Sequence, residues 1–177
     1  MGKESIDRYF GLAISYLMPG MVALFGLSYR LPELRSWFGL VAEHDTTFAG
    51  FLFVMVASIG VGLMLSAARA FVLEELTTLA KPRTGDWSKR QAVEAQYQAL
   101  ICSHYDYYKC YGNTAVAVVI FAVCYLWTTA AVLTVWDWLA AVVPLGIVVA
   151  LLLWAAINAI HRFEDKRGDL LGWPKRA

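Results

Sequence analysis

The chain alternates between long apolar runs and shorter segments rich in polar and charged residues. The four longest apolar runs cover residues 10–29, 48–68, 113–134 and 138–160. A helix needs roughly 20 apolar residues to cross the hydrocarbon core of a bilayer, and each run meets that length. We therefore predict an all-α integral membrane protein with four transmembrane helices. The runs leave little chain for anything else, so residues 1–177 are expected to form a single membrane domain.

The segment between the second and third runs has the pattern of a helical hairpin. Its apolar residues keep helical spacing until Pro82 and Gly85 interrupt them. Ser88 then fits the first position of a capping box, with Gln91 as its reciprocal partner. We predict a cytoplasmic helical hairpin over about residues 69–111, with the second arm longer than the first.

The other polar segments are shorter. Residues 31–41 have helical spacing, with Pro32 suited to the first turn, and predict a short helix on the outer membrane surface. Residues 161–177 predict a charged cytoplasmic tail. Tryptophan favours the membrane–water interface. Four tryptophans are expected to be interfacial anchors: Trp37, Trp136, Trp138 and Trp173.

The basic residues fall unequally on the two sides of this predicted topology. Thirteen lie in the N-terminal segment, the hairpin and the tail, whereas the opposite side has only Arg30 and Arg35. The positive-inside rule then places both termini in the cytoplasm, and we expect the bacterial inner membrane. The net charge is only +1, and acidic residues balance the basic ones of the hairpin. No nucleic-acid partner is expected.

One face of the second run consists of small residues. They recur every four positions: Ser58, Gly62, Ser66 and Ala70. Small faces let membrane helices approach closely. This face is expected to pack either inside the chain or against another copy in a homo-oligomer.

The stretch SHYDYYKCYGN, residues 103–113, follows the predicted hairpin. Helical spacing gathers most of its aromatic residues, together with two from the preceding turns, on one face: Tyr97, Ile101, His104, Tyr108 and Tyr111, with Tyr105 at its edge. Aromatic bodies with polar tips favour a helix-packing seam at the membrane surface or a face for a protein partner.

The sequence offers little for catalysis or metal binding. Cys102, Asp106 and Cys110 share a helix face, but ligands over two turns would spread about 12 Å and could not converge on one ion. Cys102 and His104 are about 200° apart around a helix, so they do not form a nucleophile–base pair. We expect no metal, no cofactor and no catalytic residue.

The chain resembles an uncharacterised family of bacterial four-span membrane proteins with an HYxYYxxYxN motif. The resemblance lies in the order of four features: LMPG, LFGLSY, a glycine-rich second run ending in Arg, and HYDYYKCYGN. The resemblance covers roughly residues 16–113, and Lys109 and Cys110 depart from the family pattern. It implies the four-span topology and brings no assigned activity. The matching positions are His104, Tyr105, Tyr107, Tyr108, Tyr111 and Asn113.

These features favour a non-enzymatic, oligomeric membrane subunit that docks a soluble cytoplasmic protein through its hairpin. A sensor or effector in bacterial signalling or phage defence would have this form. Two alternatives stay open: an oligomeric pore or channel, and a membrane enzyme acting on a lipid or a small apolar substrate.

Overall fold

The computed structural model describes residues 3–39, 48–71, 93–130 and 134–171, with backbone alone for 3–14 and 102–103. All elements in these ranges are helical. They are α1 (Lys3–Ser28), α2 (Pro32–Trp37), α3 (Phe48–Arg69), α4 (Glu94–Leu100), the π-helical segment η3 (Ile101–Tyr105), α5 (Asp106–Thr129) and α6 (Val135–Leu171).

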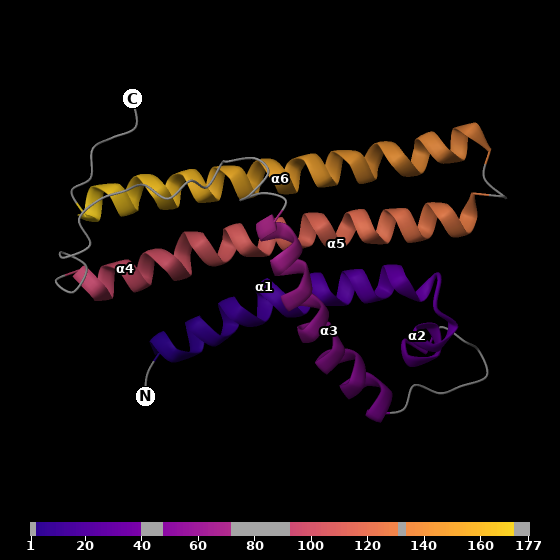
Figure 1. Cartoon of the computed structure of the whole chain (residues 1–177), viewed down its shortest axis with the longest axis horizontal. Coiled ribbons are helices and arrows are strands. Elements are labelled where there is room, and N and C mark those ends of the chain that lie inside the picture. The colour runs from indigo at the N-terminus through magenta and orange to yellow at the C-terminus, as the bar shows by residue number, and fades with distance from the viewer. Residues whose placement is uncertain (1–2, 40–47, 72–92, 131–133, 172–177) are drawn as a thin grey trace.

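Helix α5 lies between α1 and α6, and α3 crosses α1 obliquely (Figure 1). Helices α1 and α5 run in the same direction, and α6 returns alongside α5. The start of α1 and the end of α6 therefore lie at the same end of the molecule as α4 (Figure 1). Helix α2 and the α5–α6 connection lie at the opposite end.

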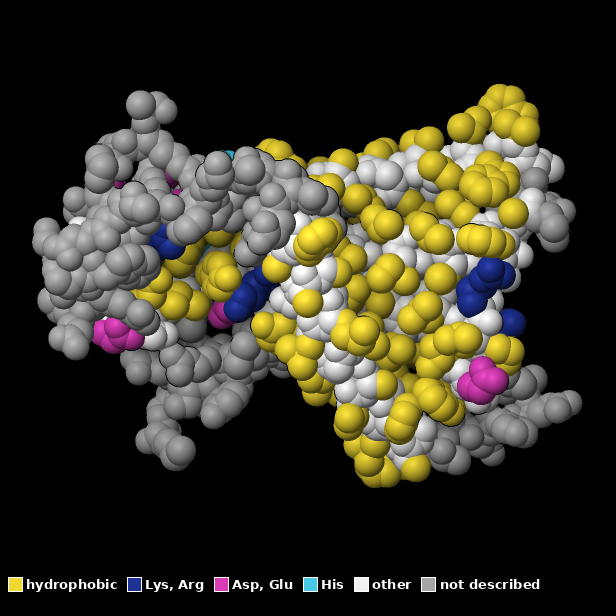
Figure 2. Space-filling model, viewed as in Figure 1, with side chains coloured by type: hydrophobic (Ala, Val, Ile, Leu, Met, Phe, Trp, Pro, Cys, Tyr) yellow, Lys and Arg dark blue, Asp and Glu magenta, His cyan; other side chains and the backbone are white. Residues whose placement is uncertain are grey.

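Three helices, α3, α5 and α6, are long and apolar enough to cross a membrane. Hydrophobic side chains cover most of their exposed surface in the view of Figure 2. Among them, Val56 of α3 is 69% exposed and Trp154 of α6 is 67% exposed. A surface so apolar suits lipid and not water. The prediction of an all-helical membrane protein is therefore confirmed at the level of three candidate spans.

Helices α1 and α3 cross with their backbones in contact. Gly62 of α3 lies on the main chain of Tyr16, and a methyl group there would overlap the Tyr16 carbonyl oxygen. Reciprocally, a methyl group at Gly20 of α1 would overlap the carbonyl oxygen of Ser58. Ser58 is fully buried, and its hydroxyl donates back to the carbonyl of Val54 at 2.6 Å. Glycine at both positions is what permits this approach.

The helix boundaries differ from the sequence expectation in two places. Helix α5 begins at Asp106, before the predicted 113, and ends at Thr129, before the predicted 134. Helix α6 continues to Leu171, so much of the predicted tail is helix. The reason is packing: Phe163 and Leu171 are buried, which extends the apolar stripe of α6 beyond the last span.

The two predicted extramembrane helices have different outcomes. The short helix after the first run is confirmed as α2, with Pro32 in its first turn and Leu34 buried. Of the predicted hairpin, the second arm is helical from α4 through η3 into α5. Residues 72–92, which would hold most of the first arm and the turn, lie outside the described residues.

Candidate functional site: a polar and aromatic layer at one end

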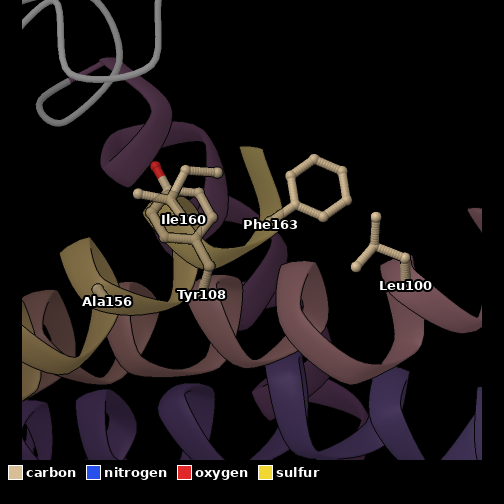
Figure 3. Packing of buried hydrophobic residues seen from close by; sticks show 5 residues of the cluster. All are labelled: Leu100, Tyr108, Ala156, Ile160 and Phe163. Carbon is tan, nitrogen blue, oxygen red and sulfur yellow. The ribbon is translucent and has the colours of Figure 1, made fainter. Parts of the chain in front are cut away.

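The end of the molecule that holds α4 has its own small core, which we call the end layer. It is formed by α4, η3, the first turns of α5 and residues 156–171 of α6. Figure 3 shows Tyr108 of α5 beside Ile160 of α6, with Ala156, Phe163 and Leu100 around them. Tyr108 is only 3% exposed, so its ring is a central element of this core.

Aromatic and ionic contacts extend this core along α6. The ring of Tyr105 lies 5.3 Å from that of Phe163. Directly after Phe163 in the chain, Glu164 accepts a hydrogen bond of 2.6 Å from Arg167, and both side chains are buried. The Arg167 guanidinium also lies 5.6 Å from the centroid of the Phe163 ring. A buried charge needs such a partner, because removing one member leaves the other uncompensated.

Below this core, a buried polar network joins α1, α3 and α5. Asn113 of α5 is fully buried and bonds to both neighbouring helices. Its side-chain oxygen accepts a bond of 3.1 Å from Nε of Arg69, and its Nδ2 donates to the carbonyl of Ser15 at 2.9 Å. The Ser15 hydroxyl in turn donates to the carbonyl of Asp106 at 3.0 Å. One amide side chain thus connects three helices.

Arg69 connects this network to the aromatic core. It is only 3% exposed, and its guanidinium lies 4.5 Å from the centroid of the Tyr108 ring. A guanidinium over an aromatic face is attracted by the ring quadrupole, more strongly when water is excluded. A buried ionisable residue at the end of an apolar helix is expensive, and here the Asn113 amide and the Tyr108 ring offset that cost.

The outer side of the end layer has a basic group. His104 lies in the π-helical segment η3, and such turns often occur at functional sites. Its Nε2 lies 3.1 Å from Nζ of Lys166 in α6. Since the ammonium can only donate, the imidazole accepts this bond in its neutral form. Burial, and then the charges of Lys166 and Arg162, hold the pKa of His104 below its ordinary value.

The predicted aromatic face lies against α6. Tyr97 and Tyr108 are buried, and the other members are half-buried: Ile101, His104, Tyr105 and Tyr111. Leu100, which is absent from the predicted face, is also buried here. Much of this surface is therefore occupied by the chain itself.

The small face and the tryptophans have mixed placements. Ser58 and Gly62 are buried at the crossing with α1, whereas Ser66 and Ala70 are half-buried.

Among the predicted tryptophan anchors, Trp37 packs on Phe53 with ring centroids 4.6 Å apart. The other two described anchors differ: Trp136 is exposed and Trp138 is half-buried, while Trp173 lies outside the described residues.

The contacts of the end layer are those of a packed surface with basic groups at its edge. In the part of the chain that the structure describes, no three potential metal ligands come together. His104 is bonded to a cation, Lys166. What the end layer offers is a packed platform with a basic outer edge.

The sequence analysis missed the Ser15–Arg69–Asn113 network. Arg69 counts there as a charge of the cytoplasmic segment, whereas the structure buries it between helices. The available signal was the set of polar residues inside or bordering apolar runs, Ser15 and Asn113 among them. Such residues in membrane helices usually face protein and not lipid.

Comparison with known proteins adds no relative: no protein-family model, no curated protein and no solved structure matches this chain.

Proposed function

We propose that this protein is a non-enzymatic subunit of the bacterial inner membrane, which docks a soluble cytoplasmic protein on its end layer. The observation that carries the proposal is the packing of α4 and the first turn of α5 on α6 through Leu100, Tyr108 and Phe163. This packing gives a firmly held platform that continues a membrane helix. Its outward positions on α4, such as Ala95 and Ala99, are exposed.

In this proposal α1 is the fourth span. It has 26 residues, enough length to cross the hydrocarbon core, and its segment Ser15–Ser28 is apolar. Its buried contacts with α3 and α5 give it a place in the bundle. The end layer is then cytoplasmic, as are both termini, in line with the excess of basic residues on that side.

The exposed surface favours this proposal over a pore. The outward side chains of α6 in its apolar part include Val143, Ile147 and Leu151, each at least half exposed. A water-filled pore formed by several copies needs polar groups along its lining. An apolar surface suits lipid or another apolar helix, which agrees with a membrane subunit that assembles as a homo-oligomer.

Photo-crosslinking in native membranes tests the docking proposal. A photoreactive amino acid is placed at Ala95 or Ala99 on the end layer, and at Leu151 as a matched, lipid-facing control. We expect one discrete protein adduct from the first two positions and none from the third. Adducts of the same size from all three positions, or none from any, would contradict docking through the end layer.

Labelling of single-cysteine variants tests the topology separately. Positions 35 and 135 should react with a membrane-impermeant reagent in intact cells, because α2 and the α5–α6 connection would face outward. Positions 94 and 169 should react only after permeabilisation. Labelling of position 169 in intact cells would refute the proposed orientation.

A further inference from the structure

A basic cluster lies on the outer edge of the end layer, where η3 meets α6. Arg162 and Lys166 are four residues apart on α6 and therefore share a face. Both side chains are exposed. Nζ of Lys166 is fixed 3.1 Å from Nε2 of His104. Three basic side chains from two helices thus converge on one surface.

The two cations of this cluster, Arg162 and Lys166, have no acidic partner among the described residues. The neighbouring Arg167, by contrast, is held by Glu164. Burial, and then the charges of Lys166 and Arg162, hold the pKa of His104 below its ordinary value. An anion is the group that would relieve the crowding of these positive charges.

The position of the cluster along α6 indicates the kind of anion. The apolar part of α6 runs from Val135 to Ile160, and the charged residues follow directly. At 1.5 Å per residue this part is about 39 Å long, slightly more than the hydrocarbon core of about 30 Å. With this part centred in the bilayer, Arg162 lies at the level of the lipid headgroups, and Lys166 lies about 6 Å further out along the helix.

The surface next to the cluster suits an acyl chain. Leu151 lies eleven residues before Arg162, which is three turns, so the two side chains point the same way within about 20°. Leu151 is 59% exposed, and Ile147, one turn further along, is 55% exposed. A phosphate at Arg162 would therefore continue into an apolar strip on the same face of α6. A soluble phosphate would make no use of that strip.

We propose that Arg162 and Lys166 bind the phosphate of an anionic phospholipid in the cytoplasmic leaflet. The guanidinium of Arg162 presents two parallel donors to the phosphate, and the Lys166 ammonium keeps donors beyond the one given to His104. His104 acts as a positioning residue, because it holds Lys166 toward the cluster. The inference rests on the membrane embedding given above as the proposed function.

Native mass spectrometry of the full chain in detergent micelles tests the site. Phosphatidylglycerol or phosphatidylcholine is added at equal concentration, and the bound fraction gives an apparent affinity. The R162Q/K166Q variant should lose about twenty-fivefold in affinity for phosphatidylglycerol, at about fivefold per basic residue. The R30Q/R35Q variant removes the same charge at the other end and should bind like the wild type.

Three results would overturn the inference. One is equal affinity of the wild type for the two lipids, and another is an equal loss in the R30Q/R35Q control. The third is displacement of phosphatidylglycerol by inorganic phosphate at the same concentration, which would assign the site to a soluble phosphate. Arg162→Gln alone should show the fivefold loss, and circular dichroism checks that each variant is folded. Crosslinking from Ala95 does not depend on this site, so the two proposals can fail separately.

Discussion

The backbone contact between α1 and α3 can be tested with a pair of glycines in one helix. Gly62 and Gly60 both lie in α3, two residues apart, and differ in their surroundings. A methyl group at Gly62 would overlap the main chain of Tyr16, whereas one at Gly60 would meet nothing within 4 Å. Changing each glycine to alanine therefore adds the same group in two different environments.

The expected change in the free energy of unfolding follows from comparing the two variants. Alanine is better than glycine in a helix by up to about 1 kcal/mol, and both variants gain this term. The difference between them isolates the overlap with Tyr16. Overlap with a main-chain carbonyl cannot be relieved by a rotamer change, so the helices must separate, at a typical cost of about 1–3 kcal/mol or more. Gly60→Ala should be neutral or stabilising, and Gly62→Ala destabilising.

The assay is reversible unfolding in mixed micelles of a mild detergent and SDS, followed by circular dichroism. Gly20→Ala provides a second test, because its methyl group would overlap the carbonyl of Ser58. Gly146→Ala in α6 is its control, since nothing lies within 4 Å of that position. If Gly62→Ala and Gly20→Ala unfold at the same SDS fraction as their controls, the close crossing is wrong.

Three further predictions concern the end layer. Tyr108→Phe should lower the free energy of unfolding only slightly, because the ring under Arg69 is kept. Tyr108→Ala removes the ring and should cost about 3–5 kcal/mol. A Phe variant that is fully stable but inactive would instead indicate an enzyme. Asn113→Ala should cost about 1.5–3 kcal/mol, the usual value for a bond from a charged donor, here Arg69; unchanged SDS unfolding would contradict the network. The pKa of His104 lies below its ordinary value of 6.5, so the unfolded chain binds the proton more tightly. The contribution of His104 to stability should be full above pH 6.5 and should fall as the pH drops toward the lower pKa of the folded state. His104→Gln should therefore flatten the dependence of the free energy of unfolding on pH. An unchanged pH dependence in this variant would refute the assignment to His104.

The long apolar runs predicted the helical spans well, because length and hydropathy alone decide whether a helix suits a bilayer. The small face shows how a strict spacing of four departs from the geometry of a helix. At about 100° per residue, a strict spacing of four drifts, so Ala70 lies about 120° from Ser58 around the helix, but Arg69 only about 20° away. The buried stripe of α3 accordingly ends at Arg69. A cation at the end of an apolar run was attributed to solvent when the helical geometry placed it inside.

The end layer was harder to predict. The π-helical turn Ile101–Tyr105 inserts a longer turn into an otherwise regular helix, and nothing in ICSHY marks it. The sequence also could not pair His104 with Lys166, because a separation of 62 positions leaves the register of α5 against α6 open. By contrast, the continuation of α6 was visible in the spacing of Ile160, Phe163 and Leu171.

Helix α6 has a mechanical consequence. Its 37 residues form one continuous helix, about 55 Å long at 1.5 Å per residue, which exceeds the 40–45 Å of a bilayer with its headgroups. A change in bilayer thickness alters the tilt that best matches such a helix to the lipid. Because Phe163 and Ile160 attach α4 and η3 to this same rod, any change of tilt moves the end layer with it.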